Sequence, residues 1–136
     1  MRAGRSLALS CVVAAAFVLS SRAEAQQLRT RVYASGFTAP AAFVQDPTDR
    51  RVQFVVEQGG RIRVVRDGAV LPTDFLDLRG QITSGGERGL LGLVFAPDYG
   101  LTRRFYVNFT NPSGHTVVAR FLRSATNPTH RPPQTG

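Results

Sequence analysis

The most informative segment of this sequence is Gly85-Gly86-Glu87-Arg88-Gly89-Leu90-Leu91-Gly92-Leu93-Val94-Phe95-Ala96-Pro97-Asp98-Tyr99. Its paired glycines permit a tight turn, because a residue without a Cβ tolerates backbone angles that other residues avoid. The unbroken apolar run from Leu90 to Phe95 predicts a strand that is buried on both faces. Ala96-Pro97-Asp98 then supplies the turn residues that end the strand. We therefore expect a glycine turn with two charges, Glu87 and Arg88, at the entrance of a buried strand.

A similar order of features occurs earlier in the chain. Ala41 to Gln45 reads as another buried strand, and Pro47 follows it as Pro97 follows Phe95. The two copies lie about 50 residues apart, a period typical of propeller blades with four strands each. A β-sandwich is the structural alternative.

Several further strands are expected between and after these two segments. Two hairpin signals, Gly59-Gly60 and Asp67-Gly68, divide runs that are rich in β-branched residues. They predict a four-stranded antiparallel meander, since no connection is long enough for a crossover helix. The expected strands cover Val32 to Ala34, Val52 to Glu57, Arg61 to Arg66, Ala69 to Leu71, Arg103 to Val107 and Thr116 to Phe121. No segment shows helical periodicity, so the fold class is all-β.

Charged residues alternate with aliphatic ones in the run that begins at Arg61. Side chains of a strand point to opposite faces in turn, so Arg61 and Arg63 share one face, which we expect to be solvent. The same rule places Asp74 and Asp77 on opposite faces of an extended stretch. This argues against a metal site shared by the two carboxylates.

The N-terminus has the order of a secretory signal peptide. Arg2 and Arg5 precede an apolar run from Leu7 to Leu19, and Ala23-Glu24-Ala25 fits a cleavage site. The run is short for a membrane anchor, which is the alternative. We therefore expect residues 1–25 to be removed, leaving residues 26–136 secreted or periplasmic with no membrane span. The single cysteine, Cys11, lies in the signal, so no disulfide is expected.

The basic charge of the chain is spread along its length. The sequence has a net charge of +8, and all of its 17 basic residues are arginine. Acidic residues lie among them, whereas runs of like charge mark interaction tails. We therefore expect a solvated surface and no nucleic-acid partner, and a module for anionic polymers is the lowest-ranked function.

Four segments in a fixed order form a recognisable set: Glu57-Gln58-Gly59-Gly60-Arg61-Ile62-Arg63-Val64, Phe75-Leu76-Asp77-Leu78, Gly86-Glu87-Arg88-Gly89-Leu90-Leu91-Gly92-Leu93 and Arg104-Phe105-Tyr106-Val107. With Phe95 and Pro97-Asp98-Tyr99 they resemble the soluble quinoprotein glucose/sorbosone dehydrogenases, the family of the PQQ-dependent aldose sugar dehydrogenases. The similarity runs from about Tyr33 to Phe121. It implies that residues 26–136 form about two N-terminal blades of a six-bladed β-propeller, incomplete in this chain.

The resemblance also implies a function for the whole protein. Members of the family use pyrroloquinoline quinone (PQQ) and calcium to oxidise the C1 hydroxyl of an aldose, and the electrons pass to an external acceptor. This sequence would then be the N-terminal portion of an exported sugar dehydrogenase. The cofactor carries the redox chemistry in such enzymes, and the protein orients it.

Residue by residue, the resemblance assigns one position. Glu87 falls where relatives have a Gln or Glu near the sugar, so it is the expected substrate-binding residue, with pairing to Arg88 or Arg79 as the structural alternative. The catalytic histidine and the PQQ and calcium ligands belong to later blades, so none is expected in this chain. His115 and His130 match no family motif and are expected in exposed loops.

Two further interpretations remain at this point. Asn108-Phe109-Thr110 matches the pattern of an N-glycosylation sequon. It falls in an expected buried strand, so we do not expect glycosylation there. A non-catalytic, secreted β-propeller that binds a partner is the alternative function, because this architecture has many roles. A fragment of two blades is expected to be inactive alone.

Overall fold

The computed structural model describes residues 28–125 of the chain. It divides the chain into two units, Met1–Thr30 and Arg31–Gly136. The predicted signal peptide and His130 lie outside the described residues. Both sheets of the fold lie in the second unit.

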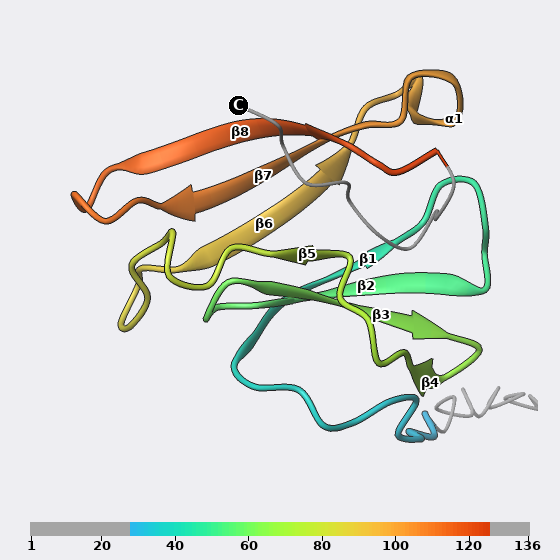
Figure 1. The fold of residues 1–136 in the computed structure, drawn as a ribbon. Coiled ribbons are helices and arrows are strands. Elements are labelled where there is room, and N and C mark those ends of the chain that lie inside the picture. Colours follow the sequence, from blue (N-terminus) through green and yellow to red (C-terminus); the bar gives the residue numbers. More distant parts are fainter. Residues whose placement is uncertain (1–27, 126–136) are drawn as a thin grey trace, which may run out of the picture. The chain divides into compact units, whose positions relative to one another are not determined.

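The first sheet is an antiparallel meander with the strand order β1-β2-β3-β4 (Figure 1). A short additional strand also pairs with β3, at the end away from β4. The predicted four-stranded meander is therefore confirmed, with one strand more than expected. The strands are β1 (Pro40–Gln45), β2 (Val52–Glu57), β3 (Arg61–Arg66), β4 (Ala69–Val70) and β5 (Leu76–Asp77).

The second sheet repeats this plan with three antiparallel strands in the order β6-β7-β8. One turn of helix, α1 (Tyr99–Thr102), follows the first strand where the Pro-Asp turn was predicted. The strands are β6 (Leu90–Phe95), β7 (Arg104–Thr110) and β8 (Thr116–Leu122). The repeated order strand, turn, strand, strand is therefore present in both sheets.

The hairpin loops differ in length from each other. Asp67 and Gly68 form a two-residue loop with φ values of 50° and 83°, and a two-residue turn with positive φ at both positions fits the twist of antiparallel strands. The loop between β2 and β3 has three residues, not the predicted two, because Glu57 pairs directly with Arg61. Gly60 closes that loop with φ of 112° and donates its N–H to the carbonyl of Glu57 at 2.9 Å.

The two sheets share one hydrophobic core in which aromatic rings are central. The ring centroids of Phe54 and Phe75 lie 4.4 Å apart, and those of Phe54 and Phe95 lie 5.4 Å apart. Phe75 also lies 4.7 Å from Phe105, so rings from both sheets are in contact. Such pairs contribute about 0.5–1.5 kcal/mol each beyond the burial of their area.

The predicted burial of Leu90–Phe95 on both faces is wrong. Strand β6 is an edge strand, and in the described residues only its inner face packs on the core, so that Val94 is 59% exposed. Every residue of β2 is buried instead. Composition alone could not distinguish the two strands, because an apolar run does not show which neighbours cover it.

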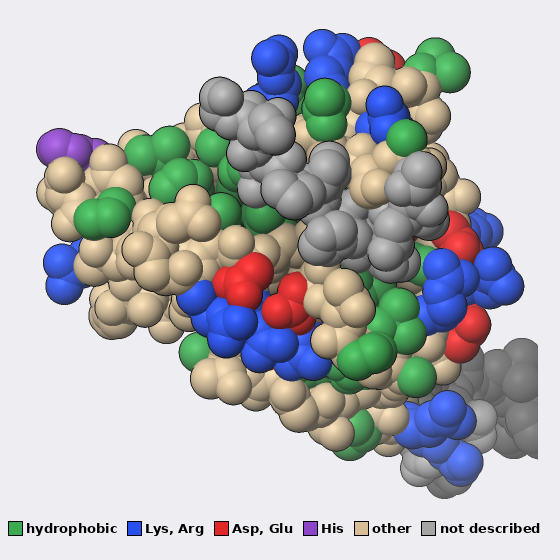
Figure 2. All heavy atoms as spheres, viewed as in Figure 1, with side chains coloured by type: hydrophobic (Ala, Val, Ile, Leu, Met, Phe, Trp, Pro, Cys, Tyr) green, Lys and Arg blue, Asp and Glu red, His purple; other side chains and the backbone are tan. Residues whose placement is uncertain are grey.

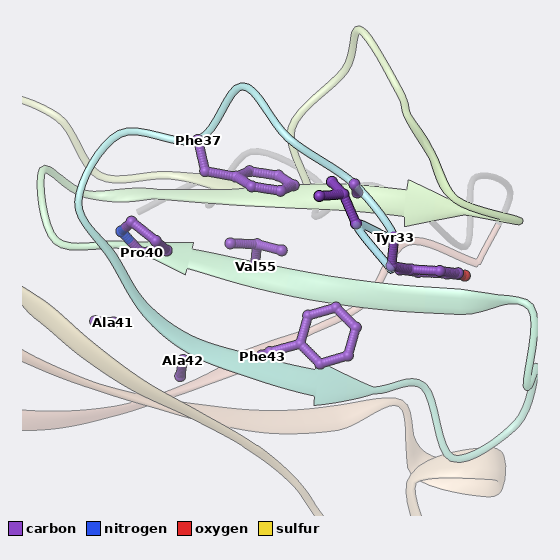
Figure 3. A pocket seen from close by; sticks show the side chains of 9 residues that line it. Tyr33, Phe37, Pro40, Ala41, Ala42, Phe43 and Val55 are labelled. Carbon is purple, nitrogen blue, oxygen red and sulfur yellow. The ribbon is translucent and has the colours of Figure 1, made fainter. Parts of the chain in front are cut away.

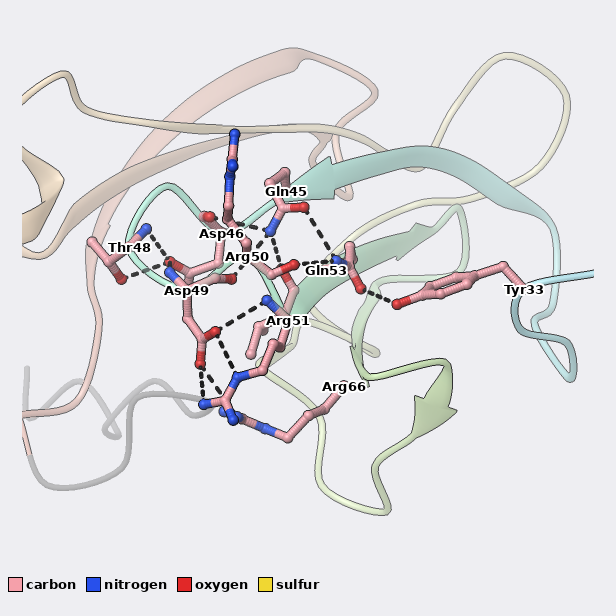
Figure 4. Close-up of polar contacts among 10 residues, drawn as sticks. Tyr33, Gln45, Asp46, Thr48, Asp49, Arg50, Arg51, Gln53 and Arg66 are labelled. Carbon is pink, nitrogen blue, oxygen red and sulfur yellow. Dashed lines mark hydrogen bonds and ion pairs between the residues drawn. The ribbon is translucent and has the colours of Figure 1, made fainter.

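The segment before β1 is not the short strand predicted at Val32-Tyr33-Ala34. Tyr33 is held by side chains: its hydroxyl donates to Oε1 of Gln53 at 2.9 Å, and the Gln53 amide donates to Oε1 of Gln45 at 3.1 Å (Figure 4). The ring of Tyr33 also meets that of Phe43 edge-on at 6.5 Å. Side-chain contacts therefore replace the strand ladder that was expected here.

Strand β1 is present as predicted, but it is only half-buried. Its side chains alternate, so Ala42 and Val44 face the core while Phe43 is 60% exposed. Phe43, Phe37, Pro40 and Val55 line an apolar hollow of about 460 Å³ on the other face (Figure 3). The described residues thus leave the outer face of this sheet partly uncovered.

Candidate functional site

The turn that precedes β6 presents Glu87 to solvent. Gly85 donates its N–H to the carbonyl of Arg88 at 2.9 Å, and Arg88 donates back to Gly85 at 3.1 Å. These two bonds leave Gly86 and Glu87 at the tip of a closed turn. Gly85 and Gly86 have φ values of 119° and 57°, where glycine is favoured. The predicted glycine turn is therefore present, and the Glu87 side chain is exposed at its tip.

The side chain of Gln58 holds this turn from the β2–β3 loop. Its Nε2 donates to the carbonyl of Gly86 at 2.6 Å and to that of Arg88 at 3.1 Å. The carbonyl of Gln58 accepts the N–H of Leu90 at 2.9 Å. The two carbonyls bound by the Gln58 amide belong to the residues on either side of Glu87.

Gly89 fixes the other end of the turn by its lack of a side chain. Its φ is 149°, and a Cβ at this position would overlap the carbonyl oxygen and Cγ of Gln58. Its carbonyl accepts the N–H of Thr110 at 2.9 Å, and its own N–H reaches Oγ1 of Thr110 at 3.4 Å. The turn is thus attached to the first sheet through Gln58 and to the second sheet through Thr110.

The carboxylate of Glu87 makes no hydrogen bond or ion pair with any of residues 28–125. The alternative pairing with Arg79 does not occur, because Arg79 binds both carboxylate oxygens of Asp77 at 3.0 Å through its Nε. This contact holds the pKa of Asp77 below its usual range. Glu87 therefore has both of its oxygens available to accept hydrogen bonds from a ligand.

The arginine face of β3 is not the solvent face that the alternation predicted. Arg61 donates to both oxygens of Asp74, at 2.7 and 3.0 Å, and Nε of Arg63 lies 3.0 Å from the same carboxylate. The side chains of Arg61 and Arg63 are only 28% and 15% exposed. The expectation failed because Asp74 approaches from the loop before β5, a contact that alternation within one strand does not reveal.

Glu57, the last residue of β2, has a buried carboxylate with partners of its own. It is 3% exposed, its Oε1 accepts the N–H of Thr38 at 2.9 Å, and Nη1 of Arg63 lies 3.7 Å away. A hollow of about 210 Å³ lies beside it, lined also by Arg61 and Arg79. Glu57 lies directly opposite Arg61 in the strand register, but its ion pair is with Arg63, two residues further along β3.

Among residues 28–125, Asp74 and Asp77 form no shared metal site. Asp74 and Asp77 bind different arginines, and within residues 28–125 no three His, Cys, Asp or Glu side chains come together around a possible metal position. His115 is exposed at the tip of the β7–β8 hairpin, as predicted, where its N–H donates to Oδ1 of Asn111 at 2.9 Å. Residues 28–125 therefore contain no cluster of calcium ligands.

The distribution of surface charge, the sequon and the possibility of a membrane span were further expectations from the sequence. Acidic side chains lie beside basic ones over the face shown in Figure 2, so this face has no uniform positive field. Asn108 of the sequon lies within β7, the central strand of its sheet, and its Oδ1 is buried. Among residues 28–125 no helix is both long and apolar enough to cross a membrane.

Solved structures similar to this chain include sugar dehydrogenases. The PQQ-bound aldose sugar dehydrogenase of Streptomyces coelicolor matches with a TM-score of 0.61 and 25% identity, over 73% of this chain and 29% of that one. A putative oxidoreductase (glucose dehydrogenase) from Thermus thermophilus matches with a TM-score of 0.63 and 27% identity, over the same shares. The apo-form aldose sugar dehydrogenase of Escherichia coli, at 22% identity and a TM-score of 0.62, shows the same fold.

Curated relatives of another kind also match. Hedgehog-interacting protein from mouse is 30% identical and that from human 28% identical, over 69% of this chain and 15% of each relative. No family model matches the chain. The chain therefore spans less than a third of the length of the solved structures and a smaller share still of these curated relatives.

The comparisons decide between the two architectures that the sequence left open. The sheets are part of a β-propeller, and the partial coverage fits an incomplete one. The suspected kinship with the soluble, PQQ-dependent sugar dehydrogenases is confirmed.

Proposed function

From its kinship with the soluble sugar dehydrogenases, we propose that this chain is part of an exported, PQQ-dependent enzyme that oxidises an aldose at C1. The electrons would pass to an external acceptor, and Glu87 would bind the sugar. The observation that carries this proposal is the exposed carboxylate of Glu87, which pairs with none of residues 28–125 and lies on a turn held at both ends. PQQ would supply the oxidising power, held by residues outside the described part of the chain.

The chemistry of Glu87 in this proposal is hydrogen bonding. Sugar hydroxyls donate, and a carboxylate accepts such bonds more strongly than a neutral group does. The turn is already closed by the bonds between Gly85 and Arg88, so sugar binding need not order it. A binding group that is already in place avoids part of the entropic cost of association.

A non-catalytic binding propeller is the second candidate, and the similarity to Hedgehog-interacting protein favours it. That relative's name describes an interaction with a protein, so the same fold is compatible with a binding role. The outer sheet faces, with the exposed Phe43 and Val118, supply apolar surface for such a role. A measurement of catalytic turnover distinguishes the two candidates, because only the enzyme would oxidise a sugar.

The test uses the complete protein that contains this chain, loaded with PQQ and calcium. We expect aldoses to reduce an artificial electron acceptor, and Glu87→Ala to lower kcat/KM about tenfold, the equivalent of about 1.4 kcal/mol. Asp67→Asn is the matched control, because Asp67 is an exposed acid at the opposite end of β3. Absence of turnover with a panel of aldoses would favour the binding propeller, and normal kinetics of Glu87→Ala would remove Glu87 from the site.

A further inference from the structure

We propose that Gln58 is the positioning residue of the sugar site, acting through Glu87. This inference rests on the proposed function. Gln58 follows the last residue of β2 and lies 29 positions before Glu87. Its amide nitrogen nevertheless binds the carbonyls of both residues that flank Glu87, at 2.6 and 3.1 Å.

The geometry gives Gln58 control over the position of the turn tip. The Nε2 group has two N–H donors, and each has one carbonyl as its partner. The backbone pair of Gly85 and Arg88 closes the turn, but a Cβ added at Gly85 or Gly86 would meet no atom within 4 Å, so the tip is not packed against neighbouring atoms there. The Gln58 amide is therefore the side-chain anchor that holds the Glu87 backbone on both sides.

The backbone of Gln58 is itself held by hydrogen bonds on both sides. The backbone of Gln58 accepts the N–H of Leu90, the first residue of β6, and its N–H donates to the carbonyl of Ala39 at 2.9 Å. Gly89 leaves room for this approach, since a side chain there would overlap Gln58. The amide that holds the turn thus projects from a backbone that is itself bound on two sides.

Gln58 is assigned no contact with the sugar. Both of its donors are used by backbone carbonyls, so its effect on binding must pass through the turn. Loss of the donors should loosen the turn, lower the affinity for sugar and leave the chemical step unchanged. Such a separation of KM from kcat distinguishes positioning from catalysis.

Gln58→Met is the test variant, because methionine matches glutamine in length and lacks an N–H donor. In the complete protein we expect about a fivefold rise in sugar KM, the worth of one hydrogen bond, with kcat unchanged. We also expect about fivefold faster hydrogen exchange at the amides of Gly85 and Arg88 with an unchanged melting temperature. Gln81→Met is the matched control, because Gln81 is exposed and its side chain makes no hydrogen bond to the described residues.

The double variant decides how Gln58 acts. In the Glu87→Ala background, Gln58→Met should change the KM no further. If Gln58→Met raised the KM equally in the parent and in the Glu87→Ala background, or left the exchange rates at Gly85 and Arg88 unchanged, the positioning role of Gln58 would be overturned. The sugar contact of Glu87 would be unaffected by that result. A normal KM for Glu87→Ala would instead overturn the sugar contact, and the exchange rates would then decide whether Gln58 holds the turn.

Discussion

The guanidinium carbon of Arg123 lies 4.7 Å from the centre of the Tyr99 ring, and Nη1 of the same residue lies 3.8 Å from Oδ2 of Asp46. Arg123 follows β8, whereas Asp46 follows β1, so this side chain links the ends of the two sheets. Asp46 is itself held by the backbone N–H and hydroxyl of Thr48, each at 2.7 Å (Figure 4). Burial raises the pKa of the Tyr99 hydroxyl.

The first prediction is that Arg123→Ala destabilises the complete protein by about 2 kcal/mol, because the variant loses a cation–π contact and leaves the carboxylate of Asp46 without its cation. Chemical denaturation measures the change. Arg120→Ala is the control, since Arg120 is exposed on β8 and makes no ion pair with the described residues. Equal stability of the two variants would show that the link contributes nothing.

The second prediction concerns the arginine face of β3. Asp74→Asn should cost about 2 kcal/mol of stability, because Arg61 and Arg63 are partly buried and would lose the carboxylate that they share. Asp67→Asn removes the same charge from an exposed turn and should cost almost nothing. The free energies of unfolding of the two variants are the measurement, and a neutral Asp74→Asn would mean that solvent already screens these arginines.

The third prediction is that Gly89→Ala distorts the Glu87 turn. A Cβ would overlap Gln58, and the φ of 149° is strained for alanine, so we expect a loss of about 2–3 kcal/mol. Gly100→Ala is the control, because its Cβ would meet Thr48 at 3.6 Å, an ordinary contact. Thermal unfolding of both variants checks this, and similar melting temperatures would argue against close packing at Gly89.

The fourth prediction is a pH dependence at α1. Hydrogen bonds from Arg104 and Thr102 lower the pKa of Asp98 below 3.8, so the folded state binds the proton less readily than the unfolded chain. The stability from this contact is present above about pH 4 and is lost as the pH falls through the folded pKa. Asp98→Asn should therefore flatten the decline of melting temperature between about pH 4 and pH 2. A decline equal to that of the parent protein would contradict the prediction.

The fifth prediction is that residues 26–136 alone do not fold cooperatively and show no dehydrogenase activity with PQQ and calcium. Phe43, Val94 and Val118 are 60%, 59% and 69% exposed in the described residues, and β1, β6 and β8 are edge strands. Exposed apolar edges favour aggregation. A sharp thermal transition of a monomer, or reduction of an acceptor with glucose, would be the contrary result.

Most strands were predictable from sequence because their signals are local. Asp67-Gly68 marks a hairpin, and the alternation in Arg61–Arg66 indicates which side chains share a face of the strand, without reference to other parts of the chain. Burial was not predictable in the same way. Leu90–Phe95 is more apolar than Val52–Glu57, yet the latter is the strand with strands on both sides.

The candidate site was predictable only in part. The glycines around Glu87 predict a turn, and the resemblance identifies the residue. Gln58 could not be found from the sequence, because its partners lie 28 and 30 positions away and no local pattern marks a glutamine as their donor. The burial of Arg61 was missed for the same reason, since its partner Asp74 lies 13 positions away.

The attachment of the Glu87 turn to both sheets makes the position of the turn sensitive to their spacing. Gln58 belongs to the loop that joins β2 to β3, and Thr110 is the last residue of β7. A shift of one sheet against the other would pull on the turn through Gly89 and through the amide of Gln58. Substitutions in the shared aromatic core, such as at Phe54 or Phe105, are therefore a route by which affinity for a ligand can be tuned without touching the ligand.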